Sequence, residues 1–234
     1  MVGTIALVFS SLTSVIGHLY AKEGRQSTQR YYEAFHLLNF LIGLVFYLGY
    51  YAIIDNLVTV FFGDGLMVSR ELTFVISFNG FVSFMRQSGL TFRDATGTFY
   101  NDRWKPIVEG VLNAVLSIMF IEWMGVKGVI LATAITNLLI CHIVEPYVVY
   151  KHAFCASPKK HYIRNYSMIA IFGLALLVLH FGMVAMDNQW LELLVNGCIS
   201  VGISGVVCLV MVLKYKDLLS LLVGMRSKKT NLSG

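Results

Sequence analysis

Long apolar stretches constrain this chain more than any other feature of its sequence. We place them at residues 2–21, 37–54, 72–92, 107–125, 128–150, 167–185 and 190–213. A helix of about 20 residues, rising about 1.5 Å per residue, crosses the hydrocarbon core of a bilayer. The stretches are continuous, whereas the strands of a membrane β-barrel alternate apolar and polar residues. The sequence therefore predicts an all-α, polytopic membrane protein with about seven transmembrane helices.

The composition agrees with a lipid environment. Hydrophobic residues make up 57% of the 234 residues and charged residues 13%, roughly half the charged fraction of a soluble domain. We divide the chain into a transmembrane bundle, residues 1–213, and a basic cytoplasmic tail, residues 214–234. Within the tail, residues 218–225 are apolar between basic residues, which is typical of a short helix lying on an anionic membrane surface. An ordinary amphipathic connection is the alternative there.

The basic residues are distributed asymmetrically between the two sides of the predicted bundle. Of 18 Lys and Arg residues, 15 lie in the tail and in connections 22–36, 93–106 and 151–166. The alternate connections contain only Arg70 and Lys127, and Arg86 lies inside a span. The positive-inside rule then places the N-terminus outside and the C-terminus in the cytoplasm. This topology explains the basic excess, so we predict no nucleic-acid partner.

The sequence has none of the motifs of a soluble enzyme or a metal site. Its four cysteines lack close pairs or metal-ligand spacing, and its six histidines have no i, i+4 pairing. A nucleophile elbow, a phosphate-binding glycine loop and a paired acidic motif are all absent from the sequence. We therefore predict no enzymatic activity, no cofactor, no metal and no disulfide.

Several predicted spans carry polar residues at helical spacing, where positions four apart share a face. The stripes are Ser10, Ser14 and His18; Asn79, Ser83, Arg86 and Gln87; Glu109, Asn113 and Ser117; Thr133, Thr136, Asn137 and Cys141; and Asn196, Ser200 and Ser204. For the first and last of them we favour close helix packing, with the lining of a cavity as the alternative. Polar groups are costly against lipid, so the middle stripes predict a wet cavity. The candidate substrate-binding residues are Arg86, Asn79, Gln87, Glu109, Asn113 and Asn137.

Two positions near the predicted inner ends of spans allow two interpretations each. Arg86 either extends its side chain to the cytoplasmic headgroups, or pairs with Glu109 on the next helix and exchanges it for an anionic headgroup. Pro146 has no N–H and deprives the carbonyl of His142 of its helical partner, which predicts a kink. Glu145 and Pro146 therefore form either a gate or a simple bend at the membrane edge.

A run of short motifs extends from residue 93 to residue 151. It consists of Arg93, Ala95-Thr96-Gly97, Phe99, Arg103, Lys105-Pro106, Asn113, Leu116-Ser117-Ile118, Gly125-Val126-Lys127-Gly128-Val129, Ala132-Thr133 and Glu145-Pro146-Tyr147-Val148-Val149-Tyr150-Lys151, with Gly17-His18-Leu19-Tyr20-Ala21-Lys22-Glu23 upstream. These motifs resemble the polysaccharide flippases of the multidrug/oligosaccharidyl-lipid/polysaccharide (MOP) superfamily, which export O-antigen, capsule and teichoic-acid units.

The resemblance implies a MATE-like flippase fold, of which this chain would be the C-terminal bundle, in the bacterial cytoplasmic membrane. It implies a lipid-linked oligosaccharide as substrate, flipped across the membrane during polysaccharide biosynthesis. The partners would be membrane lipids and either the missing N-terminal half or a second copy of the chain. The role that the family gives to basic cavity residues would fall on Arg86.

Two other classes of membrane protein compete with this interpretation. A cation-coupled multidrug exporter of the same superfamily would have an acidic residue near the middle of a span, and we place no carboxylate there. A seven-helix receptor or retinal protein shares the predicted topology. However, the last predicted span contains no lysine and the outer loops contain no cysteine. The sequence therefore favours the lipid-linked sugar flippase.

Overall fold

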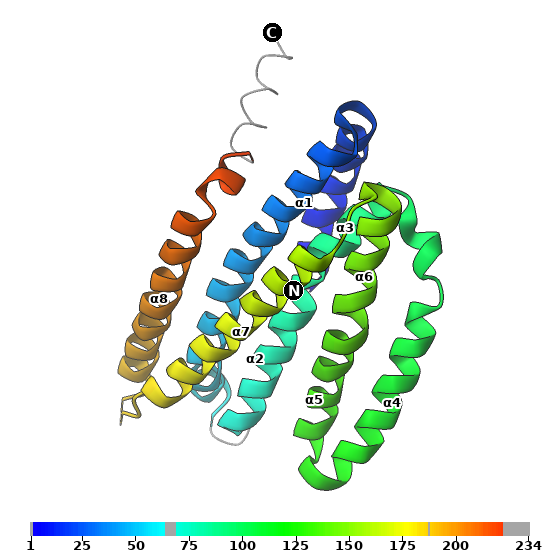
Figure 1. The fold of residues 1–234 in the computed structure, drawn as a ribbon. Coiled ribbons are helices and arrows are strands. Elements are labelled where there is room, and N and C mark those ends of the chain that lie inside the picture. The colour runs from blue at the N-terminus through cyan, green and yellow to red at the C-terminus, as the bar shows by residue number, and fades with distance from the viewer. Residues whose placement is uncertain (1, 64–68, 187, 222–234) are drawn as a thin grey trace.

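The computed structural model describes residues 2–63, 69–186 and 188–221, with side chains described from residue 13 onward. These residues form helices and no strands, so the predicted all-α class is confirmed (Figure 1). The α-helices are α1 (Val2–Phe62), α2 (Arg70–Met85), α3 (Gln87–Ala95), α4 (Lys105–Met124), α5 (Val126–Thr136), α6 (His142–Val148), α7 (Lys159–Gly182) and α8 (Gln189–Lys214). A 3-10 turn at Thr98–Asp102 precedes α4, and π-helical turns at Asn137–Cys141 and Val149–Phe154 flank α6.

The chain reverses direction within α1, at Gly24 (Figure 1). Gly24 has φ 80° and ψ −176°, a backbone conformation that residues with a Cβ rarely adopt. Ile16 before the turn and Tyr32 after it belong to one buried cluster. The predicted connection over residues 22–36 is therefore wrong, because helix continues on both sides of a single glycine. Residues of high helix propensity such as Arg25 and Gln26 allow this extension.

Among the described residues, five helical segments are long and apolar enough to cross a membrane. They are Thr13–Phe62, Thr98–Met124, Val126–Phe154, Lys159–Gly182 and Gln189–Lys214. The third predicted span, residues 72–92, falls across α2 and α3 and is not among the five. The structure thus supports a membrane-embedded helical bundle, and the number of seven spans stays a prediction.

A row of buried apolar residues in the part of α1 that follows Gly24 forms the centre of the bundle. Leu37, Phe40, Leu44 and Leu48 are fully buried against residues of α2, α7 and α8. Their spacing of three or four residues places them on one helix face. The ring of Phe81 in α2 stacks on that of Phe172 in α7, with centroids 3.7 Å apart, and closes the same core.

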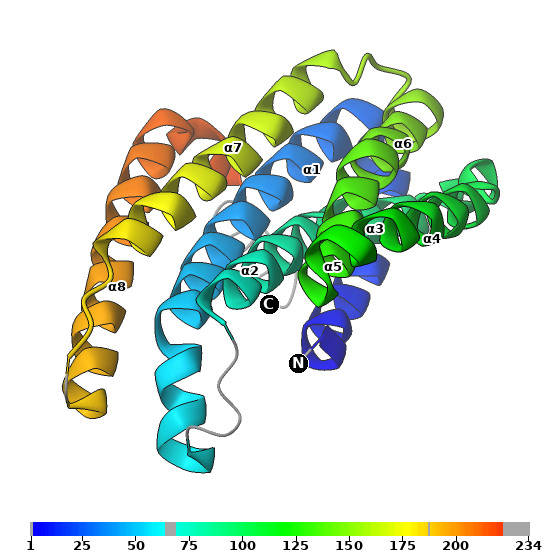
Figure 2. The same ribbon diagram turned by 90° about the horizontal axis from the view of Figure 1, so that it is seen from below.

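The two edges of the bundle are formed by α4 and α8 (Figures 1 and 2). Within α4, only Lys105 is buried, whereas Ile107, Val111, Ile118 and Trp123 are more than half exposed. An apolar face of this extent is unfavourable in water, so it supports contact with lipid. α4 packs on α5 through a tight turn at Gly125, which has φ 59°.

The polar stripe of α8 makes helix contacts, in agreement with the packing interpretation. Asn196, Ser200 and Ser204 are buried, and α8 packs on α1. The side chain of Asn196 also donates to and accepts from the backbone of Val184, at 3.1 and 3.0 Å, and so closes the turn between α7 and α8. Of the predicted interfacial helix at 218–225, residues up to 221 are helical and residues 222–225 lie outside the described residues.

Candidate functional site

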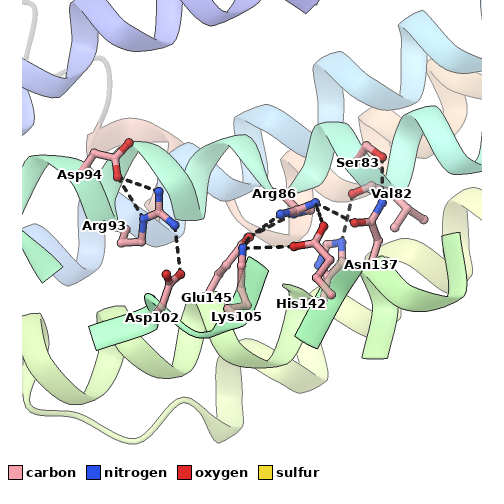
Figure 3. Close-up of polar contacts among 11 residues, drawn as sticks. Val82, Ser83, Arg86, Arg93, Asp94, Asp102, Lys105, Asn137, His142 and Glu145 are labelled. Carbon is pink, nitrogen blue, oxygen red and sulfur yellow. Dashed lines mark hydrogen bonds and ion pairs between the residues drawn. The ribbon is translucent and has the colours of Figure 1, made fainter. Parts of the chain in front are cut away.

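Two cations and two carboxylates meet where α2, α4 and α6 come together, and we call them the ionic cluster. They are Arg86, Lys105, Glu109 and Glu145. The guanidinium of Arg86 donates through Nη2 and Nε to Oε1 of Glu145, at 2.7 and 3.1 Å (Figure 3). Its Nη1 lies 3.4 Å from Oε1 of Glu109. The ammonium of Lys105 also bonds to Oε1 of Glu145, so a single carboxylate holds both cations.

The chain brings these side chains together at irregular points of its helices. Arg86 stands at the break between α2 and α3, and Lys105 is the first residue of α4. Glu109 follows Lys105 by one helical turn, with Nζ and Oε2 3.7 Å apart. Glu145 directly precedes Pro146 inside the short helix α6. Local breaks allow these polar groups to converge without a long stretch of regular helix between them.

The ionic cluster is closed on one side and partly open on the other. The side chains of Glu145 and Lys105 are 2% and 4% exposed, that of Arg86 is 16% exposed and that of Glu109 is 26% exposed. Glu109 also makes the longest contacts of the four. It is therefore the group that can leave the cluster at the lowest cost. The two positive and two negative charges balance, as burial away from water requires.

Asn137 supports the Arg86 guanidinium from the side opposite Lys105 (Figure 3). Its Oδ1 accepts from Nη1 of Arg86 at 2.7 Å, and its Nδ2 donates to the hydroxyl of Ser83 at 3.0 Å. Asn137 begins a π-helical turn, a local insertion that often occurs at functional sites. The amide of Asn137 holds the guanidinium in place, because its oxygen bonds to Arg86 while its nitrogen is anchored to Ser83.

Tyrosines of α7 satisfy backbone carbonyls in the irregular segment around α6. The hydroxyl of Tyr166 donates to the carbonyl of Leu138 at 2.8 Å, and that of Tyr162 donates to the carbonyl of Ile143 at 2.7 Å. Backbone groups in lipid must find partners within the protein. These two hydrogen bonds therefore help the segment to depart from a regular helix beside the ionic cluster.

A chain of hydrogen bonds between buried side chains runs beside the ionic cluster and joins five helices. His142 Nε2 lies 3.0 Å from the carbonyl of Val82, and His142 Nδ1 lies 3.0 Å from Nδ2 of Asn165. Asn165 Oδ1 lies 3.1 Å from His36 Nε2, and His36 Nδ1 lies 2.8 Å from the hydroxyl of Ser88. We call this series the histidine chain.

The carbonyl of Val82 determines which atom donates and which accepts in every hydrogen bond of the histidine chain. A carbonyl can only accept, so His142 Nε2 donates, and in a neutral ring its Nδ1 must then accept. The amide nitrogen of Asn165 consequently donates to His142, and its oxygen accepts from Nε2 of His36. His36 Nδ1 accepts in turn from the hydroxyl of Ser88. Both histidines are thus neutral Nε2–H tautomers with every ring nitrogen satisfied.

A small cavity separates the ionic cluster from the histidine chain. Arg86 and Glu145 of the ionic cluster line it together with His36, His142 and Asn165 of the histidine chain. Its volume of about 10 Å³ is close to that of one water site. His161 also lines it, and the Nδ1 atom of that ring is buried without a hydrogen-bond partner in the described part of the chain. The cavity therefore has room and polar atoms for one bridging water.

The described residues contain no group of three or more His, Cys, Asp or Glu side chains arranged to hold a metal. This holds although the rings of His36 and His161 lie close together, with centroids 4.6 Å apart. His161 instead contacts the hydroxyl of Tyr32 through Nε2, at 3.3 Å. The buried histidines thus take part in hydrogen bonding.

The structure brings together some of the predicted site residues. Arg86, Glu109 and Asn137 are in contact, including the predicted pair between Arg86 and Glu109. The main partner of Arg86 is nevertheless Glu145, which we predicted only as part of a gate. Pro146 does lie inside a helix, flanked by π-helical turns. The guanidinium is held by these partners, which disfavours the interpretation that Arg86 extends to the headgroups.

The other predicted residues lie outside the ionic cluster. Asn113 contacts Thr133 at 3.4 Å and Ser117 at 3.0 Å, so it belongs to the packing of α4 on α5. Asn79 lies further along α2, and its Oδ1 is buried without a hydrogen-bond partner among the described residues. Gln87 follows the helix break and takes part in none of the contacts of the ionic cluster.

Sequence reasoning missed Lys105 and the histidine chain. Lys105 was assigned to a basic cytoplasmic connection, although its i, i+4 spacing to Glu109 could have indicated a pair on one helix face. His36 and Asn165 are 129 residues apart in sequence, so no local pattern could have revealed their contact.

Searches of protein-family models, curated proteins and solved structures found no match for this chain. The resemblance to polysaccharide flippases therefore remains a prediction based on the motifs.

Proposed function

We propose that this chain is part of a transporter that flips lipid-linked sugars across the membrane, and that the ionic cluster receives their diphosphate. The observation that carries the proposal is the sharing of the buried carboxylate of Glu145 by Arg86 and Lys105. Because both cations contact the same carboxylate oxygen, they lie close enough together to hold one phosphate group once Glu109 has withdrawn. The planar fork of an arginine and the point charge of a lysine are both established partners of phosphate oxygens.

The resting cluster is neutral, so the diphosphate must replace carboxylates and not simply add to the site. Glu109 leaves first, because it is the most exposed member and its contacts are 3.4 and 3.7 Å long. Glu145 stays, since its buried position offers no path to solvent. Displacement of the Glu109 carboxylate leaves one positive charge unbalanced, so the exchange favours a negatively charged headgroup over a neutral one. Asn137 keeps the guanidinium in place during the exchange.

Export tests this proposal in cells that depend on the chain together with whatever completes the transporter. Arg86→Ala should abolish glycan export while the protein still inserts, and Arg86→Lys should retain only part of the activity. Arg70→Ala is the matched control, because Arg70 lies on the same helix outside the ionic cluster and its side chain is 38% exposed. Full export by Arg86→Ala would refute the role of the cluster.

A binding measurement separates recognition from the rest of the transport cycle. A fluorescent polyprenyl diphosphate should bind the purified chain more tightly than the corresponding polyprenyl alcohol. Arg86→Ala should remove this preference. Equal binding of the two lipids by the unmodified chain would contradict diphosphate recognition.

Cation-coupled drug export is the second candidate, and the burial of Glu145 favours it. At 1% exposure, this carboxylate is the kind of group that such exporters use for coupling. Efflux of a cationic dye from cells overproducing the chain would support this alternative if Glu145→Gln abolished it. If cells overproducing the chain show no dye efflux but do export glycan, the result supports the flippase and rejects the drug exporter.

A further inference from the structure

A second polar site lies at one end of the bundle and shares no residue with the ionic cluster. It is a groove of about 490 Å³ between the part of α1 that follows Gly24, the start of α7 and the end of α8, and we call it the end groove. Its basic residues are Arg30 of α1, Arg164 of α7 and Lys214 of α8. Each comes from a segment that the positive-inside rule places at the cytoplasmic surface. The end groove is therefore expected to face the headgroups of the inner leaflet.

The guanidinium of Arg164 has donors without acceptors. Its Nη1 bonds to Glu33 at 3.1 Å, but Nε and Nη2 are buried and have no hydrogen-bond partner among the described residues. Buried donors are almost always satisfied, and the cost is higher when the group is charged. These two donors indicate an acceptor that is not among the described residues.

The other charges of the end groove leave a positive excess. Arg30 and Lys214 are exposed and form no ion pair with a described acidic residue. The charge of Glu33 is already matched, because it accepts from Arg164 and, at 3.1 Å, from the hydroxyl of Tyr150. Asp217 is the remaining acidic residue that lines the groove. Three basic and two acidic residues therefore favour a ligand with one negative charge.

We propose that the end groove binds the headgroup of an anionic phospholipid of the inner leaflet. Its phosphate lies against Arg30, Arg164 and Lys214, and it accepts from Nε and Nη2 of Arg164 once that side chain turns toward the groove. Leu218 and Leu221 line the same groove and give the start of an acyl chain an apolar surface. Free phosphate offers the same oxygens but makes no use of these leucines. The proposal does not depend on the transport function proposed above.

Native mass spectrometry of the purified full chain tests the site. Phosphatidylglycerol and phosphatidylcholine with identical acyl chains are titrated separately, and the bound copies are counted. The double variant Arg30→Gln/Lys214→Gln loses two charge-assisted contacts to the phosphate in the groove, and it should bind phosphatidylglycerol about 30-fold more weakly than the unmodified chain. Lys159→Gln/Lys160→Gln is the matched control, because both lysines are exposed on α7 and neither lines the groove. The control should bind like the unmodified chain.

The charge-preserving variant Arg30→Lys/Lys214→Arg separates a lost site from a misfolded protein, and it should keep most of the binding. An equal loss in the control variant would mean that the lipid responds only to total charge, and would overturn the proposal. Unchanged binding in Arg30→Gln/Lys214→Gln would overturn it as well. Displacement of phosphatidylglycerol by millimolar inorganic phosphate would assign the site to free phosphate and not to a lipid.

Discussion

Replacing Glu145 by Gln tests whether the ionic cluster is organised around this one carboxylate. The change keeps the volume of the side chain and removes the charge that holds Arg86 and Lys105. Two cations then remain with only Glu109, which lies 3.4 and 3.7 Å from them. Removal of one partner from a buried ion pair costs about 3–5 kcal/mol, because the remaining charge stays buried without compensation.

Glu109→Gln is the matched comparison, since it removes the other carboxylate of the same cluster. Its side chain is 26% exposed, so water can solvate the cations that it leaves. Longer contacts and partial exposure reduce the expected cost to about 1 kcal/mol. The two variants should therefore differ by about 2–4 kcal/mol in free energy of unfolding, if the buried carboxylate carries the cluster.

Unfolding by sodium dodecyl sulfate in mixed micelles gives this difference. The reporter is Cys141, which is fully buried beside the cluster and becomes reactive to a thiol reagent on unfolding. The other cysteines are replaced by Ser in all variants; they are Cys155, Cys198 and Cys208. Lys105→Met added to Glu145→Gln should recover more than about 1 kcal/mol, because it removes one of the uncompensated cations. Equal destabilisation by Glu145→Gln and Glu109→Gln would refute the reasoning.

Three further measurements address the topology, the histidine chain and the packing of α4. Single cysteines should be protected from an impermeant thiol reagent in intact cells at Ser157 and labelled at Met186, both of which are exposed; the reverse pattern would invert the topology. Asn165→Leu leaves two buried histidine ring nitrogens without hydrogen-bond partners and should lower the free energy of unfolding by about 2–6 kcal/mol. A decrease below about 1 kcal/mol would show that the hydrogen bonds of the histidine chain do not stabilise the protein. Gly128→Ala should destabilise the protein by about 1–3 kcal/mol, because its Cβ would collide with a backbone carbonyl of α4. Gly110→Ala meets nothing within 4 Å and should be neutral or stabilising in the same unfolding assay in sodium dodecyl sulfate.

The helical membrane class could be predicted because it depends on composition and on the length of apolar stretches. The ends of those stretches could not be predicted equally well. Helices extend through polar residues such as those after Gly24, since helix propensity does not require an apolar side chain. A connection of 15 expected residues is thus replaced by one glycine with a positive φ. Hydropathy therefore predicted the helical membrane class but not the turn at Gly24.

The candidate site could be predicted only where it depends on spacing along one helix. The stripe that contains Arg86 and the pairing with Glu109 followed from helical periodicity and from neighbouring antiparallel helices. The main partner of Arg86, Glu145, lies 59 residues away in the sequence. Because Glu145 precedes Pro146, we interpreted it as part of a helix kink and not as a partner of Arg86. We included Lys105 among the basic residues that indicate the cytoplasmic side, because a lysine at the start of a helix cannot be distinguished in sequence from one in a loop. Contacts of this kind depend on how helices pack, which periodicity does not specify.

The histidine chain has a consequence for how motion could pass between helices. Its hydrogen bonds have a single sense that is set by the carbonyl of Val82, so reversing one bond requires reversing the others. A rotation of α2 that withdrew this carbonyl would allow His142 to exchange tautomers and the amide of Asn165 to turn over. His36 and Ser88 would then have to follow, on two other helices. The orientation of the Val82 carbonyl therefore sets the hydrogen-bonding state of side chains on four other helices, α6, α7, α1 and α3.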